Sequence, residues 1–174
     1  MKKLEEYVRS IPDFPKEGII FRDITTVLQD ADGFHLAVDE MKNLLEGVDF
    51  DVVVGAESRG FIFGAPIAYE LRKPLVLVRK AGKLPCDTIS REYSLEYGTA
   101  TLEMHSDSIK KGQKAVIIDD LVATGGTIEC TAKLIEDLGG EVAKIICLME
   151  LKGLKGRELL KKYDLSSVIA YDGK

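Results

Sequence analysis

The sequence is poor in cysteine. Its three cysteines, Cys86, Cys130 and Cys147, are odd in number and none belongs to a C-x-x-C pair. This scarcity argues against a disulfide framework or a zinc knuckle. Cys130 and Cys147 fall in segments with helix and strand patterns, where we expect them to pack in the core. A reducing cytoplasm is the simplest setting for such a chain.

Long apolar runs and excess positive charge are missing as well. No run of apolar residues is long enough to cross a membrane, and Met1-Lys2-Lys3 is followed by two glutamates instead of the apolar region of an export signal. The formal net charge is −5, which disfavours attraction to nucleic acid or to an anionic membrane. We therefore expect small-molecule partners, with neither nucleic acid nor membrane among them.

What is present is enough apolar material for one well-packed domain. The chain has 174 residues, 45% of them hydrophobic, so we expect a single domain spanning residues 1–174. Short β-branched runs alternate with helical patterns, which is typical of an α/β fold with a parallel-sheet core and helices on both faces. The expected strands are 52–54, 75–79, 116–120, 142–151 and 168–171, and the expected helices are 34–45, 61–71, 128–138 and 157–163.

Three further segments complete the expected fold. Apolar residues spaced at i, i+3, i+4 and i+7 predict a short helix over 4–11, which Pro12 ends. Residues 80–92 are polar, contain Gly82 and Pro85 and show no periodicity, so they predict a long mobile loop. Residues 93–98 and 101–105 alternate apolar and polar side chains, as edge or antiparallel strands do.

The most informative stretch runs from Val116 to Thr127. A buried strand pattern ends in Asp119 and Asp120, and a Gly125-Gly126 pair flanked by threonines then leads into a helix. Glycines can turn successive backbone N–H groups toward one point, and the helix adds the positive end of its dipole, so this loop predicts a phosphate site. It lacks the lysine of a Walker loop and the spacing of a dinucleotide loop. A sugar phosphate fits, with its hydroxyls, directly or through a divalent metal, on the two acids.

A second anion-binding feature follows the strand at 52–54. Glu57-Ser58-Arg59-Gly60 places a guanidinium at the start of a helix, and Arg79, Lys80 and Lys83 add positive charge at the mouth of the 80–92 loop. Ligands of parallel sheets bind at the carboxyl ends of the strands, so both features are expected in one cleft. Two anion sites in one cleft suit a substrate that is phosphorylated at both ends.

These segments resemble a known family. The 116–127 stretch is similar to the phosphoribosyl-pyrophosphate motif of the type I phosphoribosyltransferases. The adenine-specific branch of that family is indicated by four further segments, Phe14 to Thr25, Glu57 to Phe61, Arg79 to Pro85 and Tyr93 to Gly98, which occur in the family's order across nearly the whole chain. The resemblance implies the fold of that family, with a small N-terminal hood in residues 1–33 over the base and a catalytic loop at about 80–92.

The resemblance also implies the activity, which is transfer of the 5-phosphoribosyl group from phosphoribosyl pyrophosphate to adenine, giving AMP and diphosphate in purine salvage. Mg²⁺, bound mainly through phosphoribosyl pyrophosphate, is the implied cofactor, and a homodimer is the implied assembly. Cys86 departs from the family pattern, which has glycine or a charged residue at this place in the loop.

Residue roles follow from the matched motifs. For phosphoribosyl pyrophosphate, the loop Ala123, Thr124, Gly125, Gly126 and Thr127 would bind the 5-phosphate, and Asp119 and Asp120 would serve the ribose hydroxyls, directly or through magnesium and water. Arg59 would hold the diphosphate. Arg79, Lys80 and Lys83 would close over it, and in the dimeric family such a loop cation can come from the neighbouring subunit.

For the base, Phe21 would stack on adenine and Leu121 would pack on its other face. Ile20 and Arg22 would offer backbone groups to the polar edge of the ring. Glu96 would handle the adenine proton during transfer, with Tyr97 beside it. Without the resemblance, Glu96 would be taken for a solvated residue of an alternating strand.

Two other functions stay open at this level. One is a sibling phosphoribosyltransferase that uses hypoxanthine, guanine, xanthine or orotate. The other is a regulator that senses phosphoribosyl pyrophosphate and binds nucleic acid, for which a helix-turn-helix domain or a basic face would be expected. The short N-terminal segment and the acidic balance disfavour that regulator.

Overall fold

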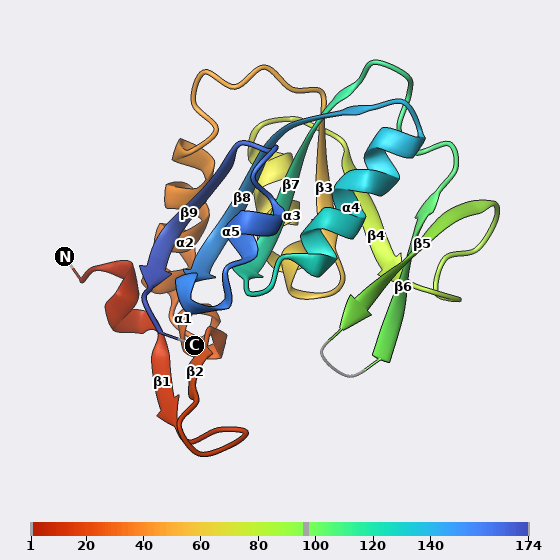
Figure 1. Cartoon of the computed structure of the whole chain (residues 1–174). Helices are drawn as coiled ribbons and strands as arrows, with labels where there is room; N and C mark the ends of the chain where they lie inside the picture. Colours follow the sequence, from red (N-terminus) through yellow and green to blue (C-terminus); the bar gives the residue numbers. More distant parts are fainter. Residues whose placement is uncertain (1, 96–97, 174) are drawn as a thin grey trace.

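A mixed sheet with a parallel core organises the molecule. The computed structural model describes residues 2–95 and 98–173, and within them a seven-stranded sheet has the order β5-β6-β4-β3-β7-β8-β9 (Figure 1). The five strands from β4 to β9 in this order are parallel, while β6 and β5 extend the β4 edge in antiparallel fashion. Their bounds are β3 Val52–Ala56, β4 Leu75–Lys80, β5 Thr88–Leu95, β6 Gly98–His105, β7 Lys114–Val122, β8 Glu141–Leu151 and β9 Leu165–Tyr171.

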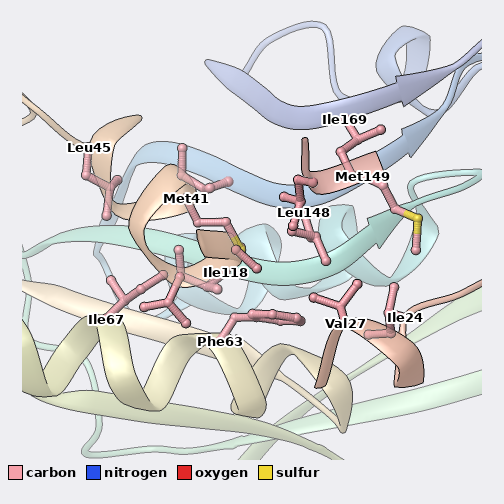
Figure 2. Close-up of a cluster of buried hydrophobic side chains, with 14 of the residues drawn as sticks. Ile24, Val27, Met41, Leu45, Phe63, Ile67, Ile118, Leu148, Met149 and Ile169 are labelled. Atoms are coloured by element: carbon pink, nitrogen blue, oxygen red, sulfur yellow. The ribbon is translucent and has the colours of Figure 1, made fainter. Parts of the chain in front are cut away.

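Helices cover both faces of this sheet, as predicted. On one face lie α2 (Ala31–Asn43) and α3 (Arg59–Glu70), and on the other lies α4 (Gly126–Asp137). Figure 2 shows the core on the first face, where Met41, Phe63 and Ile67 meet Ile118 and Leu148 of the sheet. β3 is buried along its whole length, because a central parallel strand covered on both faces needs apolar residues at every position.

The expected cysteine positions are confirmed. Cys130 is buried in α4 and Cys147 in β8, while Cys86 is exposed. Cys86 also has φ of +66°, in the left-handed region that favours glycine. A glycine would adopt this conformation with less strain than a residue that carries a side chain.

The N-terminal segment differs from the prediction. Instead of a helix over 4–11, a 3₁₀ turn η1 (Leu4–Tyr7) leads into β1 (Arg9–Pro12), which pairs antiparallel with β2 (Ile20–Asp23). The apolar spacing was read as helical, but pairing with β2 satisfies the backbone of residues 9–12 in extended form. The short helix α1 (Thr25–Leu28) follows, and Asp30 caps α2 through the Gly33 N–H, so α2 begins at Ala31, three residues before the predicted helix over 34–45.

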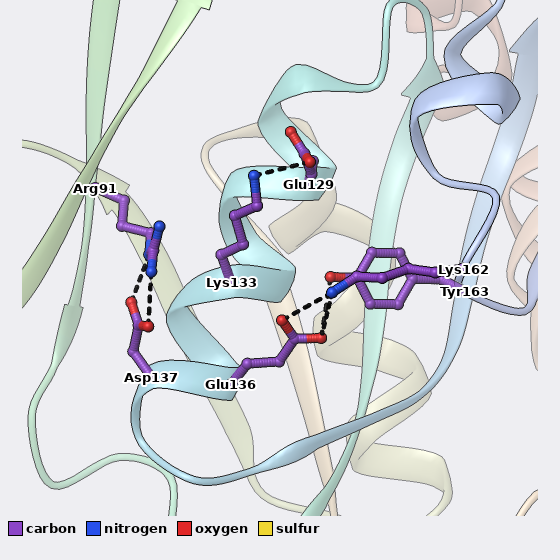
Figure 3. Close-up of polar contacts among 7 residues, drawn as sticks. All are labelled: Arg91, Glu129, Lys133, Glu136, Asp137, Lys162 and Tyr163. Carbon is purple, nitrogen blue, oxygen red and sulfur yellow. Dashed lines mark hydrogen bonds and ion pairs between the residues drawn. The ribbon is translucent and has the colours of Figure 1, made fainter.

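The predicted long loop over 80–92 was wrong in its extent. The connection after β4 covers only residues 81–87, and residues 88–92 belong to β5, which pairs with β6 in a hairpin. Ile89 and Tyr93 pack toward the core on the α4 face, but Arg91 interrupts the apolar alternation and hides the strand in the sequence. Arg91 instead forms a two-point ion pair with Asp137 of α4, with Nη2 2.8 Å from Oδ1 (Figure 3).

Short elements connect β8 to β9. A 3₁₀ turn η2 (Lys152–Leu154) and the one-turn helix α5 (Gly156–Leu159) precede a segment in which Lys162 and Tyr163 both hydrogen bond to Glu136 of α4 (Figure 3). The predicted helix at 157–163 is thus shorter and begins one residue earlier. In residues 2–95 and 98–173, no helix combines the length and apolar character that a membrane crossing needs.

Candidate active site

The carboxyl ends of β3 and β7, which are neighbours in the sheet, open into one cavity of about 380 Å³. This volume lies within the range of small-molecule sites. The β3–α3 turn contributes Glu57, Ser58 and Arg59, and Lys80 and Tyr93 come from β4 and β5. The rest of the wall comes from the predicted 116–127 stretch and the residue after it. These residues are Asp119, Asp120, Leu121, Ala123, Thr124, Gly125, Gly126 and Thr127, followed by Ile128. The two anion-binding features therefore converge in one cleft, as expected.

The glycine turn begins α4. Gly125 is the N-cap residue of that helix and has φ of +87°, which a side chain would oppose. Gly126 starts the helix, and a Cβ there would lie 3.2 Å from the ring of Tyr93. The first N–H groups of a helix have no partner within it, and the dipole of the twelve-residue α4 adds positive potential at this end. The turn is therefore built to bind an anion such as phosphate.

The two aspartates lie at the floor of the cavity and are largely buried. Only 8% of Asp119 and 5% of Asp120 are exposed, and the Asp120 N–H donates to Asp119 Oδ1 at 2.9 Å. Burial, reinforced by the charge of Asp120, raises the pKa of Asp119 well above its usual value. Burial also raises the pKa of Asp120, against the opposing effect of the Arg59 guanidinium. Two buried acids with raised pKa values at the end of a strand indicate a functional site.

Arg59 contacts Asp120 from α3. Its Nε lies 2.7 Å from Oδ2 of Asp120, although the N–H is not aligned for a hydrogen bond and Oδ2 is without one in the described part of the chain. Gly60 brings α3 close to β7, since a Cβ there would lie 2.7 Å from the Ile118 carbonyl oxygen. A buried carboxylate oxygen that lacks a hydrogen bond suits a hydroxyl donor of a ligand.

The Glu57 carboxylate contacts residues at the end of β4 and in the loop that follows it. It accepts from the Lys80 N–H at 2.8 Å and from Lys83 Nζ at 2.6 Å, and Arg79 Nε lies 3.4 Å away. Burial acts to raise the pKa of Glu57, but Lys83, the Lys80 amide and Arg79 together hold it below its usual value. The cationic side chains of Arg79 and Lys83 are thus held beside the anion cavity by one buried carboxylate.

A second cavity of about 510 Å³ adjoins the first. The two share Arg59, Asp120 and Leu121. The remaining walls come from the N-terminal hairpin and from the end of β8 with the turn after it, and they are mostly apolar. They comprise Ile19, Ile20, Phe21, Arg22, Met149, Leu151 and Leu154. An apolar slot with a few polar groups suits a flat heteroaromatic ring.

Among the described residues, the Arg22 side chain contacts Ser10 and Tyr171 and makes no hydrogen bond or ion pair with Asp119 or Asp120. Its Nη1 contacts Ser10 Oγ, and its guanidinium carbon lies 3.9 Å from the centroid of the Tyr171 ring. Phe21 packs edge-on against Phe14, with ring centroids 5.3 Å apart. Arg22 therefore links the N-terminal hairpin to β9.

The structure thus brings together most of the predicted site residues. Arg59, Lys80, the Asp pair and residues 123–127 line the first cavity, and Ile20, Phe21 and Arg22 line the second, with Leu121 between them. Arg79 and Lys83 line neither cavity and lie on Glu57 instead. Glu96 and Tyr97 lie outside the described residues.

Several lining residues were missed by sequence reasoning. Glu57 stood in the Glu57 to Phe61 segment, but its role as acceptor for the Lys80 backbone N–H and for the Lys83 side chain depends on residues 23 and 26 positions away. Tyr93 stood in the Tyr93 to Gly98 segment but was given no role, and Leu154 gave no local signal. Met149 and Leu151 alternate at the carboxyl end of a predicted strand, and the rule that ligands bind at such ends could have indicated them.

Comparisons with known proteins agree with this geometry. The phosphoribosyl transferase domain family matches residues 31–171. An adenine phosphoribosyltransferase of Lachnoclostridium phytofermentans is 71% identical over 174 residues, covering all of both chains. This chain belongs to the adenine phosphoribosyltransferase family.

Solved structures of adenine phosphoribosyltransferases share the fold. The enzyme of Thermoanaerobacter pseudethanolicus superposes with a TM-score of 0.93 at 53% identity, covering 97% of this chain and 100% of that one. The adenine phosphoribosyltransferase of Saccharomyces cerevisiae, solved with adenine and an imino-altritol bisphosphate, has a TM-score of 0.89 at 36% identity, covering 94% of this chain and 95% of that one. The sheet with its helices is therefore the type I phosphoribosyltransferase fold of this family.

Proposed function

We propose that the two adjoining cavities transfer the 5-phosphoribosyl group of phosphoribosyl pyrophosphate to adenine, releasing AMP and diphosphate. The observation that supports this most directly is the shared wall of Arg59, Asp120 and Leu121 between an anion-binding cavity and an apolar one. A sugar that lies along this wall has its phosphates on one side and a base on the other. Membership of the adenine phosphoribosyltransferase family supports the same reaction.

In this arrangement the 5-phosphate binds to residues 123–127 at the start of α4. The ribose hydroxyls donate to Asp119 and Asp120, whose buried oxygens include the acceptor that lacks a hydrogen bond. The diphosphate lies toward Arg59 and Lys80. Arg79 and Lys83 reach it by leaving Glu57, or come from a neighbouring subunit.

The base occupies the second cavity. Phe21 stacks on one face of adenine and Leu121 packs on the other, and the backbones of Ile20 and Arg22 meet its polar edge. The Arg22 side chain is already engaged with Ser10 and Tyr171, which leaves the main chain as the group that this residue offers. Glu96 manages the proton of the adenine ring, and Tyr97 lies beside it.

The charges of the site suit a transition state with separated charge. Breaking the anomeric C–O bond builds positive charge on the ribose, as in glycoside hydrolysis, and negative charge on the departing diphosphate. The Asp pair lies on the ribose side and the cations lie on the diphosphate side, so each charge is stabilised where it develops. The nitrogen of adenine attacks directly, so no serine or cysteine nucleophile is required.

Magnesium fits this site as an ion delivered with the substrate. Within residues 2–95 and 98–173, no cluster of three or more His, Cys, Asp or Glu side chains could hold a metal by itself. Mg²⁺ is commonly bound by one or two carboxylates together with substrate phosphates, and Asp119 or Asp120 could contribute through water. The ion would neutralise charge on the diphosphate as it departs.

A sibling base is the nearest alternative acceptor. Adenine presents an amino donor where 6-oxopurines present an acceptor. Because a mispaired buried polar group costs about 1–3 kcal/mol, one pocket should not bind both kinds of base well. Incubation with phosphoribosyl pyrophosphate, Mg²⁺ and adenine, hypoxanthine, guanine, xanthine or orotate tests this directly. Formation of AMP supports the proposal, and turnover of another base but not adenine overturns it.

We also propose the setting of the enzyme. It acts in the cytoplasm as a homodimer of single-domain chains, with residues 1–33 as the hood over the base and a mobile loop at residues 81–87, between β4 and β5, and it binds neither nucleic acid nor membrane. Sedimentation of the purified protein tests the dimer. Titration with DNA and RNA tests the regulator alternative, which predicts tight, salt-dependent binding.

A further inference from the structure

The turn after β8 contacts both cavities. We call residues 152–159, which form η2 and α5, the 152–159 segment. Leu154 of this segment lines the base cavity, and two residues later Gly156 is buried against the phosphate-binding turn. The 152–159 segment therefore packs against the walls of both cavities.

The contact at Gly156 leaves no room for a side chain. A Cβ on Gly156 would lie 2.3 Å from the Ala123 carbonyl oxygen and 3.1 Å from the Gly125 nitrogen, both backbone atoms of the phosphate-binding turn. The contact is reciprocal, since a Cβ on Gly125 would lie 3.0 Å from the Gly156 carbonyl oxygen. Two glycine backbones thus meet directly, and the position of one sets the position of the other.

The segment is anchored on both sides. Arg157 donates to both carboxylate oxygens of the buried Glu150, at 3.0 and 2.6 Å, and to the Leu165 carbonyl oxygen at 2.8 Å. The Arg157 hydrogen bonds lower the pKa of Glu150 against the effect of burial, which keeps the ion pair charged. Beyond α5, Lys162 and Tyr163 hold Glu136 of α4 (Figure 3).

The backbone of the segment is also constrained. Lys155, directly before Gly156, has φ of +57°, a conformation that a residue with a side chain adopts when its surroundings impose it. Its N–H donates to the Lys152 carbonyl at 3.0 Å, and the Gly156 carbonyl accepts from the buried Leu160 at 3.1 Å. Backbone hydrogen bonds therefore constrain the chain on both sides of the contact between Gly156 and the turn.

From this packing we propose that Gly156 is a positioning residue for the 5-phosphate. Because it fits against Ala123 and Gly125 only without a side chain, it keeps the N–H groups of the turn in the geometry that a phosphate requires. Arg157 maintains that placement through Glu150. This inference rests on the proposed role of residues 123–127, and it adds a requirement outside the phosphoribosyl-pyrophosphate motif.

The test compares Gly156→Ala with Gly64→Ala. A Cβ at Gly64, in α3, would meet the nearest atom at 3.4 Å, which is ordinary contact distance, so this variant controls for adding a methyl group in the core. Binding of ribose 5-phosphate and of pyrophosphate is measured by calorimetry, together with KM and kcat. A displaced group can cost up to about 10²-fold, so we expect ribose 5-phosphate affinity to fall 10- to 100-fold in Gly156→Ala. Pyrophosphate affinity should change less than twofold.

Arg157→Lys provides a second variant if Gly156→Ala fails to fold, as judged by thermal unfolding. It keeps the charge but loses the two-point contact with Glu150, and we expect a 3- to 10-fold rise in the KM for phosphoribosyl pyrophosphate with the KM for adenine unchanged. Unchanged ribose 5-phosphate binding, or equal loss of both ligands, would overturn the inference. Failure of the wild-type protein to form AMP would instead overturn the proposed function, since ribose 5-phosphate binding is measured without turnover.

Discussion

Arg59 Nε lies 2.7 Å from Oδ2 of Asp120, in the wall that separates the anion cavity from the apolar cavity. This ion pair brings α3 and β7 together at the point where the proposed ribose would lie. The cation is half exposed and the carboxylate is buried, and both residues line both cavities, so a ligand in either cavity can reach the pair.

Replacing both acids tests their role in transfer. Asp119→Asn with Asp120→Asn removes the charge that would stabilise a cationic ribose, and we expect kcat to fall by roughly 10²- to 10³-fold, the usual cost of losing electrostatic stabilisation. The fold should persist, because asparagine has the same shape and Oδ1 of residue 119 can still accept. Steady-state kinetics and circular dichroism provide the measurements, and near-normal turnover would exclude the pair from the mechanism.

The same acids should make stability depend on pH. The pKa of Asp119 is raised in the folded state, so its favourable contribution is complete below the ordinary value of about 3.8 and is lost as the pH rises through the raised value. Asp119→Asn should therefore be more stable than the wild type at pH 7, by a margin that shrinks as the pH falls toward 4. Urea unfolding across this range measures the margin, and a margin independent of pH would contradict the burial argument.

Glu57 should show the opposite pH dependence. Its pKa is held below the ordinary 4.5, so its contribution to stability is present above that value and is lost as the pH falls through the lowered one. Glu57→Gln removes the negative charge and one of the two carboxylate oxygens that accept from the Lys80 N–H and Lys83 Nζ, and we expect a loss of about 1–3 kcal/mol in the free energy of unfolding at pH 7. The loss should decrease below about pH 4.5. Glu158→Gln, at an exposed surface pair, serves as the control.

Glu96 can be tested by kinetics alone. Glu96→Gln removes the proposed proton acceptor, and positioned proton transfer contributes about 10²- to 10⁴-fold, so turnover should fall within that range. Binding of phosphoribosyl pyrophosphate should hardly change. A variant with normal kcat would leave the adenine proton to another group.

The contact between Arg22 and Tyr171 predicts an effect on the base alone. Tyr171→Leu removes a cation–π contact that holds the hairpin bearing Phe21, and such contacts are worth about 0.5–1 kcal/mol or more, so the KM for adenine should rise roughly 2- to 10-fold. Tyr171→Phe keeps the ring and should behave as the wild type. If the leucine and phenylalanine variants have equal KM values, the ring does not position the hairpin.

Local patterns were sufficient for the centre of the fold. The β-branched runs that became β3 and β7 are buried on both faces, a requirement that acts on each residue separately and is therefore visible in the sequence. The similar run that became β4 is only partly buried, with Val78 inside and Leu77 exposed, because β4 lies nearer the edge of the sheet. Asp119, Asp120 and the glycine turn could likewise be predicted from the sequence. The carboxylates and the conformational freedom of glycine are properties of the residues themselves.

Hydrophobic patterns predicted the wrong secondary structure where pairing with another β-strand decided it. Residues 9–12 had helical spacing but became β1, and residues 88–92 had no period but became β5, since each is extended only because a partner strand supplies its hydrogen bonds. Such an interaction is not encoded in the segment that adopts it.

The sequence by itself determined a parallel α/β fold and a phosphate-binding turn that follows two aspartates. Its motifs also indicated the phosphoribosyltransferase family. Only the tertiary structure decided that Glu57 pairs with Arg79 and Lys83, that Met149, Leu151 and Leu154 complete the base cavity, and that Gly156 packs against the phosphate-binding turn. The physical reason is distance along the chain. These contacts join residues that are 22 to more than 100 positions apart, and folding alone brings them within contact.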